Sequence, residues 1–204
     1  VLELGCYMQM TPALRTYLGY GDVRGAYYGP PGKTHQQSTV SVSGETFSCP
    51  IDVFDAERDR FPYPDGHFQA VLCCELLEHL ATDPMHMIAE INRILAPGGW
   101  LVLSTPNITC LRSIHAVLHG YHPELFSSYI KPGPDGSVDP RHSREYAPWE
   151  IALLAEAGGF QVELLETGDY ESPRSFENEM RKLLSGKDCS AELRGEVIYC
   201  SEIG

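Results

Sequence analysis

The fold is decided by the stretch DGHFQAVLCCELLEHL at 65–80 and by APGGWLVLSTPN at 96–107, which follows it after a helical segment. The run 70–74 is short and apolar, as expected for a strand buried on both faces, and 100–103 is a second such run. Two buried strands joined by a helix form a β-α-β crossover, the unit of a parallel sheet covered by helices. This stretch therefore predicts an α/β fold.

The helix between these strands has its own start and stop signals. Asp83 can cap its first turn, and Pro84 suits the first helical position because no N–H is needed there. Residues 97–99, Pro-Gly-Gly, are expected to end it. Polar side chains then gather at the carboxyl ends of the strands, where open α/β sheets bind ligands: Glu75, Glu78, His79 and Asn107.

Strand and helix patterns alternate along the rest of the chain. We expect strands at 1–4, 22–28, 51–54, 160–165 and 196–200, and helices from 11 onward and at 110–119, 148–157 and 176–184. Thr11 is expected to cap the first helix, with Leu14, Tyr17 and Leu18 on its apolar face. The segment 29–44 is expected to be mostly loop.

This order predicts a single domain over 1–204, with a Rossmann-like, doubly wound, mostly parallel sheet, an antiparallel last strand and three layers, α/β/α. The segment 108–147 contains a stretch too long for a simple connection, so we interpret it as a substrate-side insertion or lid. The chain opens on a strand pattern without an initiator Met, which we interpret as a missing N-terminal part.

Composition narrows the possible partners. The 204 residues carry a net charge of −13, which disfavours nucleic acid as a partner. No run approaches the ~20 apolar residues of a membrane helix, and we expect a cytoplasmic protein without membrane contact. The seven cysteines show no C-x-x-C spacing, so reduced thiols are expected. The sequence gives no indication of the oligomeric state.

Four stretches resemble class I S-adenosylmethionine-dependent methyltransferases: VLELG at 1–5, DAE at 55–57 with FPYPDGHF at 61–68, VLCCELLEHL at 71–80, and RILAPGGWLVLSTPN at 93–107. Weaker matches at 142–146 and 156–160 are similar to family members of bacterial polysaccharide and natural-product pathways. The resemblance implies S-adenosylmethionine as cofactor, with S-adenosylhomocysteine as product. It also implies cofactor-binding roles for Glu3, Gly5, Cys6, Tyr27, Asp55, Ala56 and Glu75.

Two departures from the family pattern leave open an alternative function, a methyltransferase-like module that binds without catalysis. Tyr7 and Gln9 stand where further glycines are usual, and Tyr27 stands where an acidic residue usually holds the ribose hydroxyls. A tyrosine hydroxyl can replace only part of a carboxylate's hydrogen bonding. The chain is therefore expected to be either an O-methyltransferase acting on a small-molecule or sugar-containing acceptor, or a methyltransferase-like binding module without catalysis. A nicotinamide dehydrogenase lacks support, since only Gly5 of a G-x-G-x-x-G pattern is present.

Histidines are the candidate bases, because methyl transfer to a hydroxyl requires proton removal near neutral pH. His79 follows the central strand at the expected cleft, and His142 lies in the segment interpreted as a lid. Each could instead be structural. His115, His119 and His122 have the spacing of one helical face, but Gly120 and Pro123 argue against a helix reaching His122, so no metal site is expected.

Overall fold

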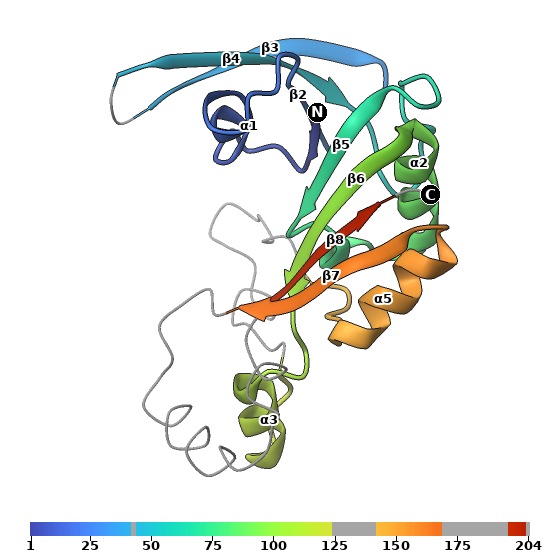
Figure 1. Cartoon of the computed structure of the whole chain (residues 1–204). Helices are drawn as coiled ribbons and strands as arrows, with labels where there is room; N and C mark the ends of the chain where they lie inside the picture. The colour runs from blue at the N-terminus through green and yellow to red at the C-terminus, as the bar shows by residue number, and fades with distance from the viewer. Residues whose placement is uncertain (42–43, 124–141, 169–195, 203–204) are drawn as a thin grey trace.

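A computed structural model describes residues 1–41, 44–123, 142–168 and 196–202. Its strands form one eight-stranded sheet in the order β3-β4-β2-β1-β5-β6-β8-β7 (Figure 1). The strands are β1 (Leu2–Leu4), β2 (Arg24–Tyr27), β3 (Lys33–Val40), β4 (Thr46–Val53), β5 (Phe68–Cys74), β6 (Leu95–Pro106), β7 (Gln161–Gly168) and β8 (Glu196–Glu202).

The sheet is parallel at its centre and antiparallel at both edges. β1 pairs in parallel with β2 and β5, β2 with β4, and β5 with β6. β3 runs antiparallel to β4, and β8 runs antiparallel to both β6 and β7. The predicted doubly wound sheet with an antiparallel last strand is confirmed.

Alternating side chains along the strands bury the two faces of the sheet against different helices. Leu2 and Val71 pack in the main core with α2 (Pro84–Ile94) and α5 (Pro148–Ala157). Val1 and Ala70 point the other way and pack with Leu14 of α1 (Thr11–Thr16). Figure 1 shows α2 and α5 together on one side of the sheet and α1 on the other. The arrangement is the predicted three-layer α/β/α fold.

The crossover that decides the fold forms almost as predicted. Asp83 caps α2 and accepts a hydrogen bond of 2.9 Å from the backbone N of Met85, with Pro84 opening the helix. The helix ends at Ile94, earlier than 97–99, because β6 already begins at Leu95 and pairs with Phe68. The helix predicted at 148–157 has those same bounds in α5.

Three local predictions are wrong. The segment 29–44 contains β3, an eight-residue edge strand whose polar and mostly exposed side chains conceal its pairing with β4. Thr11 does not cap α1; it is the first helical residue and is buried, with its hydroxyl 3.2 Å from Cys6 Sγ. α1 ends at Thr16, which leaves Tyr17 and Leu18 exposed beyond it.

The remaining predictions are tested only where the structure describes the chain. The helix predicted at 176–184 lies outside the described residues, as does 124–141 of the segment interpreted as a lid. The helix predicted at 110–119 is α3 (Leu111–Leu118), which ends before His122. Five cysteines are free thiols: Cys6, Cys49, Cys73, Cys74 and Cys110. Among the described helices, none has the length and apolar character needed to cross a bilayer.

Candidate functional site

The sheet order reverses direction between β1 and β5, and this switch point defines the site. From β1 the chain builds outward through β2 and β4 on one side, whereas β5 and β6 lie on the other. Leu4 is in register with Cys73, so the residues that follow them, Gly5 and 74–75, leave the same edge of the sheet. In open α/β sheets, ligands bind outside the carboxyl ends of the strands at such a point.

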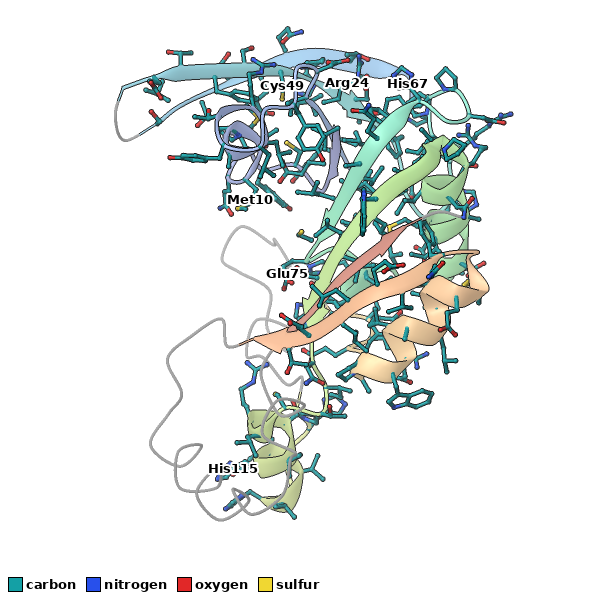
Figure 2. The ribbon with its side chains drawn as sticks, viewed as in Figure 1. Met10, Arg24, Cys49, His67, Glu75 and His115 are labelled. Carbon is teal, nitrogen blue, oxygen red and sulfur yellow. The ribbon has the colours of Figure 1, made fainter. Side chains whose placement is uncertain are left out.

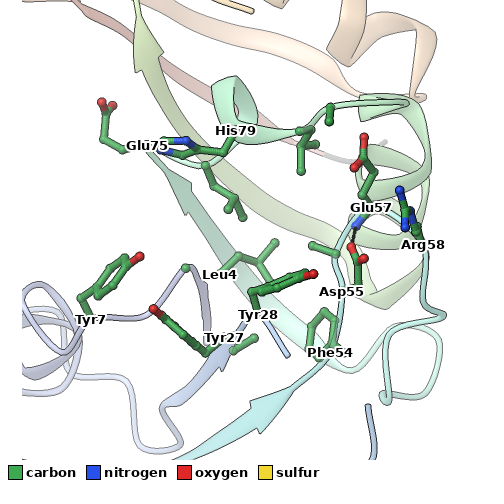
Figure 3. Close-up of a pocket in the computed structure, with 16 residues that line it drawn as sticks. Leu4, Tyr7, Tyr27, Tyr28, Phe54, Asp55, Glu57, Arg58, Glu75 and His79 are labelled. Carbon is green, nitrogen blue, oxygen red and sulfur yellow. Dashed lines mark hydrogen bonds between the residues drawn. The ribbon is translucent and has the colours of Figure 1, made fainter. Parts of the chain in front are cut away.

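A cavity of about 480 Å³ opens at this switch point (Figure 3). Its volume is in the range of small-molecule and cofactor sites. The wall consists of residues that follow β1, β2, β4 and β5, together with the 3₁₀ helix η1 (Leu77–His79). Its lining residues include Gly5, Tyr7, Tyr27, Phe54, Asp55, Ala56, Glu75, Leu76, His79 and Leu80.

Two backbone positions shape the bottom of the cavity. Gly5 has φ +67°, a left-handed conformation that suits glycine, and a Cβ there would lie 3.8 Å from Leu76. Glu75 has φ 51° at the end of β5, an uncommon conformation for a non-glycine residue. Such backbone strain clusters at functional sites. The Ser104 hydroxyl donates a 2.7 Å hydrogen bond to Glu75 Oε1 and helps fix this carboxylate.

The loop after β4 supplies the acidic end of the cavity. Asp55 Oδ1 accepts a 2.9 Å hydrogen bond from the backbone N of Glu57, and the backbone N of Asp55 donates to Asp59. Glu57 in turn accepts hydrogen bonds from the backbone N of Thr82 and of Asp83, the latter at 2.8 Å. These bonds join the loop to the opposite wall, after η1, and outweigh burial to lower the pKa of Glu57.

Five of the seven predicted cofactor-binding residues line this cavity: Gly5, Tyr27, Asp55, Ala56 and Glu75. Glu3 and Cys6 do not line it. Both are buried on the side of the sheet that faces α1, and the Cys6 thiol packs against Met8 and Thr11. Burial raises the pKa of the Glu3 carboxyl, and its Oε2 makes no hydrogen bond with the described residues.

A tyrosine pair occupies the rim after β1 and β2. The rings of Tyr7 and Tyr27 meet edge to face with their centroids 5.3 Å apart, and both line the cavity. The hydrogen bond with Tyr27 raises the pKa of the Tyr7 hydroxyl, and burial adds to this. The two departures from the family motif therefore contact each other.

Glu78 and His79 lie where η1 crosses the carboxyl end of the sheet. The Glu78 side chain is only 1% exposed, and its Oε2 accepts a 3.0 Å hydrogen bond from the Thr105 hydroxyl. Burial raises its pKa to about 7, and the negative charge of Glu75 contributes to the rise. His79 Nε2 lies 3.8 Å from Glu78 Oε1, while the His79 ring lines the cavity (Figure 3).

His142 comes to the same place although it is 63 positions further along the chain. The backbone carbonyl of Glu78 accepts hydrogen bonds from the backbone N of Ser143, at 2.6 Å, and of Arg144. The His142 ring then meets the His79 ring with centroids 5.0 Å apart. His142 Nδ1 lies 3.0 Å from Glu145 Oε1, and the Glu145 side chain is buried. The two predicted catalytic histidines are thus neighbours.

The other histidine group lies elsewhere. His115 and His119 stack on α3 with centroids 4.0 Å apart, and His122 follows the end of that helix. Figure 2 shows His115 on α3, well beyond the carboxyl end of β5 that Glu75 marks. Glu145 was not among the predicted site residues, and its signal in the sequence is its position three residues after His142. Asn107 is buried, and its Oδ1 accepts hydrogen bonds from the backbone N and hydroxyl of Thr109, so it braces the turn after β6.

Comparison with known proteins identifies the family. A family model described as "Methyltransferase domain" matches residues 1–165. A Mycolicibacterium smegmatis protein named a probable S-adenosylmethionine-dependent methyltransferase is 31% identical over 114 residues, which are 55% of this chain and 36% of that protein. The ubiquinone biosynthesis O-methyltransferase of Thiobacillus denitrificans is 32% identical over 118 residues, 58% of this chain and 47% of that protein. The chain thus spans less than half the length of either relative.

Solved structures agree on the fold. A SAM-dependent methyltransferase from Archaeoglobus fulgidus superposes with a TM-score of 0.58 at 15% identity, over 98% of this chain and 84% of that one. One from Methanosarcina mazei gives a TM-score of 0.58 at 14% identity, over 99% of this chain and 91% of that one. Fold, cavity position and family match together show that the chain belongs to the class I S-adenosylmethionine-dependent methyltransferases.

Proposed function

We propose that this chain transfers a methyl group from S-adenosylmethionine to a hydroxyl oxygen of a small-molecule acceptor. The observation that carries the proposal is the cavity at the switch point between β1 and β5, with Gly5 at its base and His79 in its wall. A cofactor and the oxygen of an acceptor can meet there beside a group that can take up a proton.

The lining residues fit the proposed cofactor. Gly5, with its positive φ and no side chain, lets the backbone at the end of β1 come close to a ligand. Phe54, Ala56 and Leu76 offer apolar surface for an adenine ring, and the Asp55 carboxylate can accept from its amino group. Glu75, at the end of β5, can accept from an ammonium group. Tyr27 would contribute a single hydroxyl to the ribose.

The bound cofactor supplies a methyl group on a positively charged sulfur. Its sulfur–methyl bond would break as the acceptor oxygen bonds to the methyl carbon, and the sulfur would keep the electron pair and become a neutral thioether. The hydroxyl proton passes to His79, our proposed base, and His142 adjoins that ring. Donor and acceptor must lie in line, so the chain contributes mainly by positioning them.

The acceptor class is inferred from three observations. The cavity wall is rich in aromatic and aliphatic side chains, which suits a small organic molecule, including a sugar-containing one. One relative is named as an O-methyltransferase of ubiquinone biosynthesis. The net charge of −13 disfavours nucleic acid as acceptor.

Binding of S-adenosylhomocysteine tests the cofactor site. We expect calorimetry to show one site per chain, and Asp55→Ala to weaken the affinity at least tenfold because the acceptor for the adenine amino group is lost. Asp22→Ala is the matched control, since Asp22 is exposed ahead of β2 and does not line the cavity. Absence of binding at millimolar ligand would contradict the proposed function.

His79→Ala tests the base. We expect turnover with a hydroxyl acceptor to fall at least tenfold while S-adenosylhomocysteine affinity is retained. His115→Ala, a histidine substitution on α3 away from the cavity, is expected to leave both unchanged. Unchanged turnover in His79→Ala would remove this residue from the mechanism.

A second candidate function is a binding module that retains the fold without methyl transfer. The Tyr7–Tyr27 pair favours it, because it stands at the rim where the family usually has glycines and a ribose-binding carboxylate. Tight binding of S-adenosylhomocysteine without transfer to any member of a hydroxyl acceptor panel would support this alternative.

A further inference from the structure

Three potential metal ligands converge at the carboxyl end of the sheet, next to the cofactor cavity. A carboxylate oxygen of Glu78, one ring nitrogen of His79 and one of His142 all lie within 4.8 Å of one another. They come from η1 and from the segment that the Glu78 carbonyl holds through Ser143 and Arg144. Two histidines and a carboxylate form a common set of ligands for first-row divalent metals.

The carboxylate in this cluster has an oxygen to which no described residue donates a hydrogen bond. Glu78 is buried, with Oε2 bonded to the Thr105 hydroxyl. Among the described residues, Oε1 has no hydrogen-bond partner, and it faces His79 Nε2 at 3.8 Å. Leaving a buried carboxylate oxygen unsatisfied is costly unless something binds it. Oε1 therefore points to a ligand between the carboxylate and the imidazoles.

The spacing suits a metal ion after a small adjustment. Ligand atoms about 2.1 Å from one ion lie at most about 4.2 Å apart, and the Glu78–His79 pair already meets this limit. The widest spacing among the three atoms is at most 4.8 Å, so a histidine ring has to turn toward the other ligands for all three to reach one ion. Glu145 Oε1 faces His142 Nδ1 at 3.0 Å, which orients Nε2 as the ligand atom. A carboxylate behind a ligating histidine is the usual supporting arrangement in metal sites.

The charge around the cluster also favours a cation. The Glu75 carboxylate is close enough to interact with Glu78, and the buried Glu145 lies behind His142. A divalent ion would neutralise much of that charge.

We propose that Glu78, His79 and His142 bind one first-row divalent cation, such as Mn²⁺ or Zn²⁺, whose open coordination positions face the cavity and receive the acceptor's oxygen atoms. The acceptor class then narrows to molecules with two adjacent oxygens, such as catechols or vicinal diols, because two neighbouring oxygens can occupy two open positions. This role rests on the proposed function, whereas the binding of the ion does not.

Binding of the ion would change how the proton leaves the acceptor's hydroxyl group. A hydroxyl bound to a divalent metal has a lowered pKa and ionises near neutral pH, releasing its proton to solvent. With the ion bound, His79 would act as a ligand in place of the base role proposed above, and His79→Ala would lower turnover through loss of the ion. The oxygen that ionises is the one that forms the bond to the methyl carbon.

Direct metal binding tests the proposal without relying on activity. Protein stripped with a chelator and then dialysed is titrated with Mn²⁺, and free Mn²⁺ is followed by electron paramagnetic resonance. We expect one site per chain, with affinity at least tenfold lower in His142→Asn and in Glu78→Gln, which retains an oxygen for Thr105. The double variant His115→Ala/His119→Ala is the matched control, because it removes the stacked histidine pair of α3 and should bind Mn²⁺ like the wild type.

The outcomes separate the two proposals. No Mn²⁺ binding at millimolar concentration, or Mn²⁺ affinity that is unchanged in His142→Asn, would overturn the metal site. His142→Asn changes a partly exposed side chain, so it tests the site even if Glu78→Gln fails to fold. S-adenosylhomocysteine titration of the same stripped protein reports on the cofactor cavity alone. Metal binding without cofactor binding would therefore reject the proposed function and retain the ion site.

Discussion

The buried Asp52 carboxylate joins three segments of the chain through hydrogen bonds. It lies on β4 and accepts hydrogen bonds from Arg24 at 2.9 and 3.1 Å, from Thr34 at 2.5 Å and from Tyr63 at 2.9 Å. These partners come from β2, β3 and the loop before β5. Burial alone would raise its pKa, but the hydrogen bonds from Thr34, Tyr63 and Arg24 outweigh burial and leave the pKa lowered.

Asp52→Asn is expected to destabilise the fold by about 2–4 kcal/mol at pH 7, because it weakens the bonds to a buried, paired carboxylate. The lowered pKa also predicts a pH dependence. The stabilisation by Asp52 is complete above the ordinary aspartate pKa of about 3.9 and is lost as the pH falls through the lower folded-state value. Urea unfolding midpoints at pH 7 and pH 3 measure this, and the gap between wild type and variant should narrow at pH 3.

Asp22→Asn is the control for that comparison, since Asp22 is exposed and should leave the unfolding midpoint nearly unchanged. A gap between wild type and Asp52→Asn that stays constant from pH 7 to pH 3 would show that the carboxylate charge is not what stabilises this part of the sheet.

The packing of α5 on α2 depends on a glycine at the end of α5. A Cβ on Gly158 would overlap Cγ2 of Ile88, which is fully buried on α2. Asn92 of α2 also donates a 2.9 Å hydrogen bond to the Gly158 carbonyl. Gly158 has φ −80°, so alanine is acceptable to the backbone and the cost is one of packing.

Gly158→Ala is therefore expected to lower the free energy of unfolding by about 1–3 kcal/mol through overpacking. Gly21→Ala is the control, because a Cβ there meets nothing within 4 Å, and it should be neutral or slightly stabilising. Urea unfolding followed by circular dichroism compares the two. Equal stability of Gly158→Ala and wild type would mean that α5 can move away from α2 at little cost.

Elements differ in how well the sequence predicts them, for physical reasons. α2 and β5 could be predicted because burial imposes apolar periodicity on them and Asp83 and Pro84 mark the helix start. β3 could not be predicted, because it is an edge strand whose side chains are mostly exposed, and such a strand needs no alternation of apolar and polar residues. Its pairing with β4 is made by the backbone. Cys6 was expected at the cofactor on motif grounds, but its side chain packs toward α1.

At the scale of the whole molecule, the site joins segments that are distant in sequence, and this limits prediction from sequence. His79 could be placed near the cavity because it follows β5 directly. Its contact with His142 depends on hydrogen bonds from Ser143 and Arg144 to the Glu78 carbonyl, and such long-range backbone bonds have no local sequence signal. The tyrosine pair at the rim likewise joins distant segments, since Tyr7 follows β1 and Tyr27 ends β2.

The same assembly of segments predicts how a ligand changes the stability of the whole chain. The cavity wall combines loops after β1, β2, β4 and β5 with η1, so a ligand bound there must be lost when the domain unfolds. S-adenosylhomocysteine at 100 times its dissociation constant adds about 2.7 kcal/mol. For a domain of this size, that free energy corresponds to an increase in Tm of about 5–10 °C. Thermal unfolding with and without ligand measures it. Asp55→Ala should show a smaller increase at the same ligand concentration, and an unchanged wild-type Tm at millimolar ligand would contradict binding in this cavity.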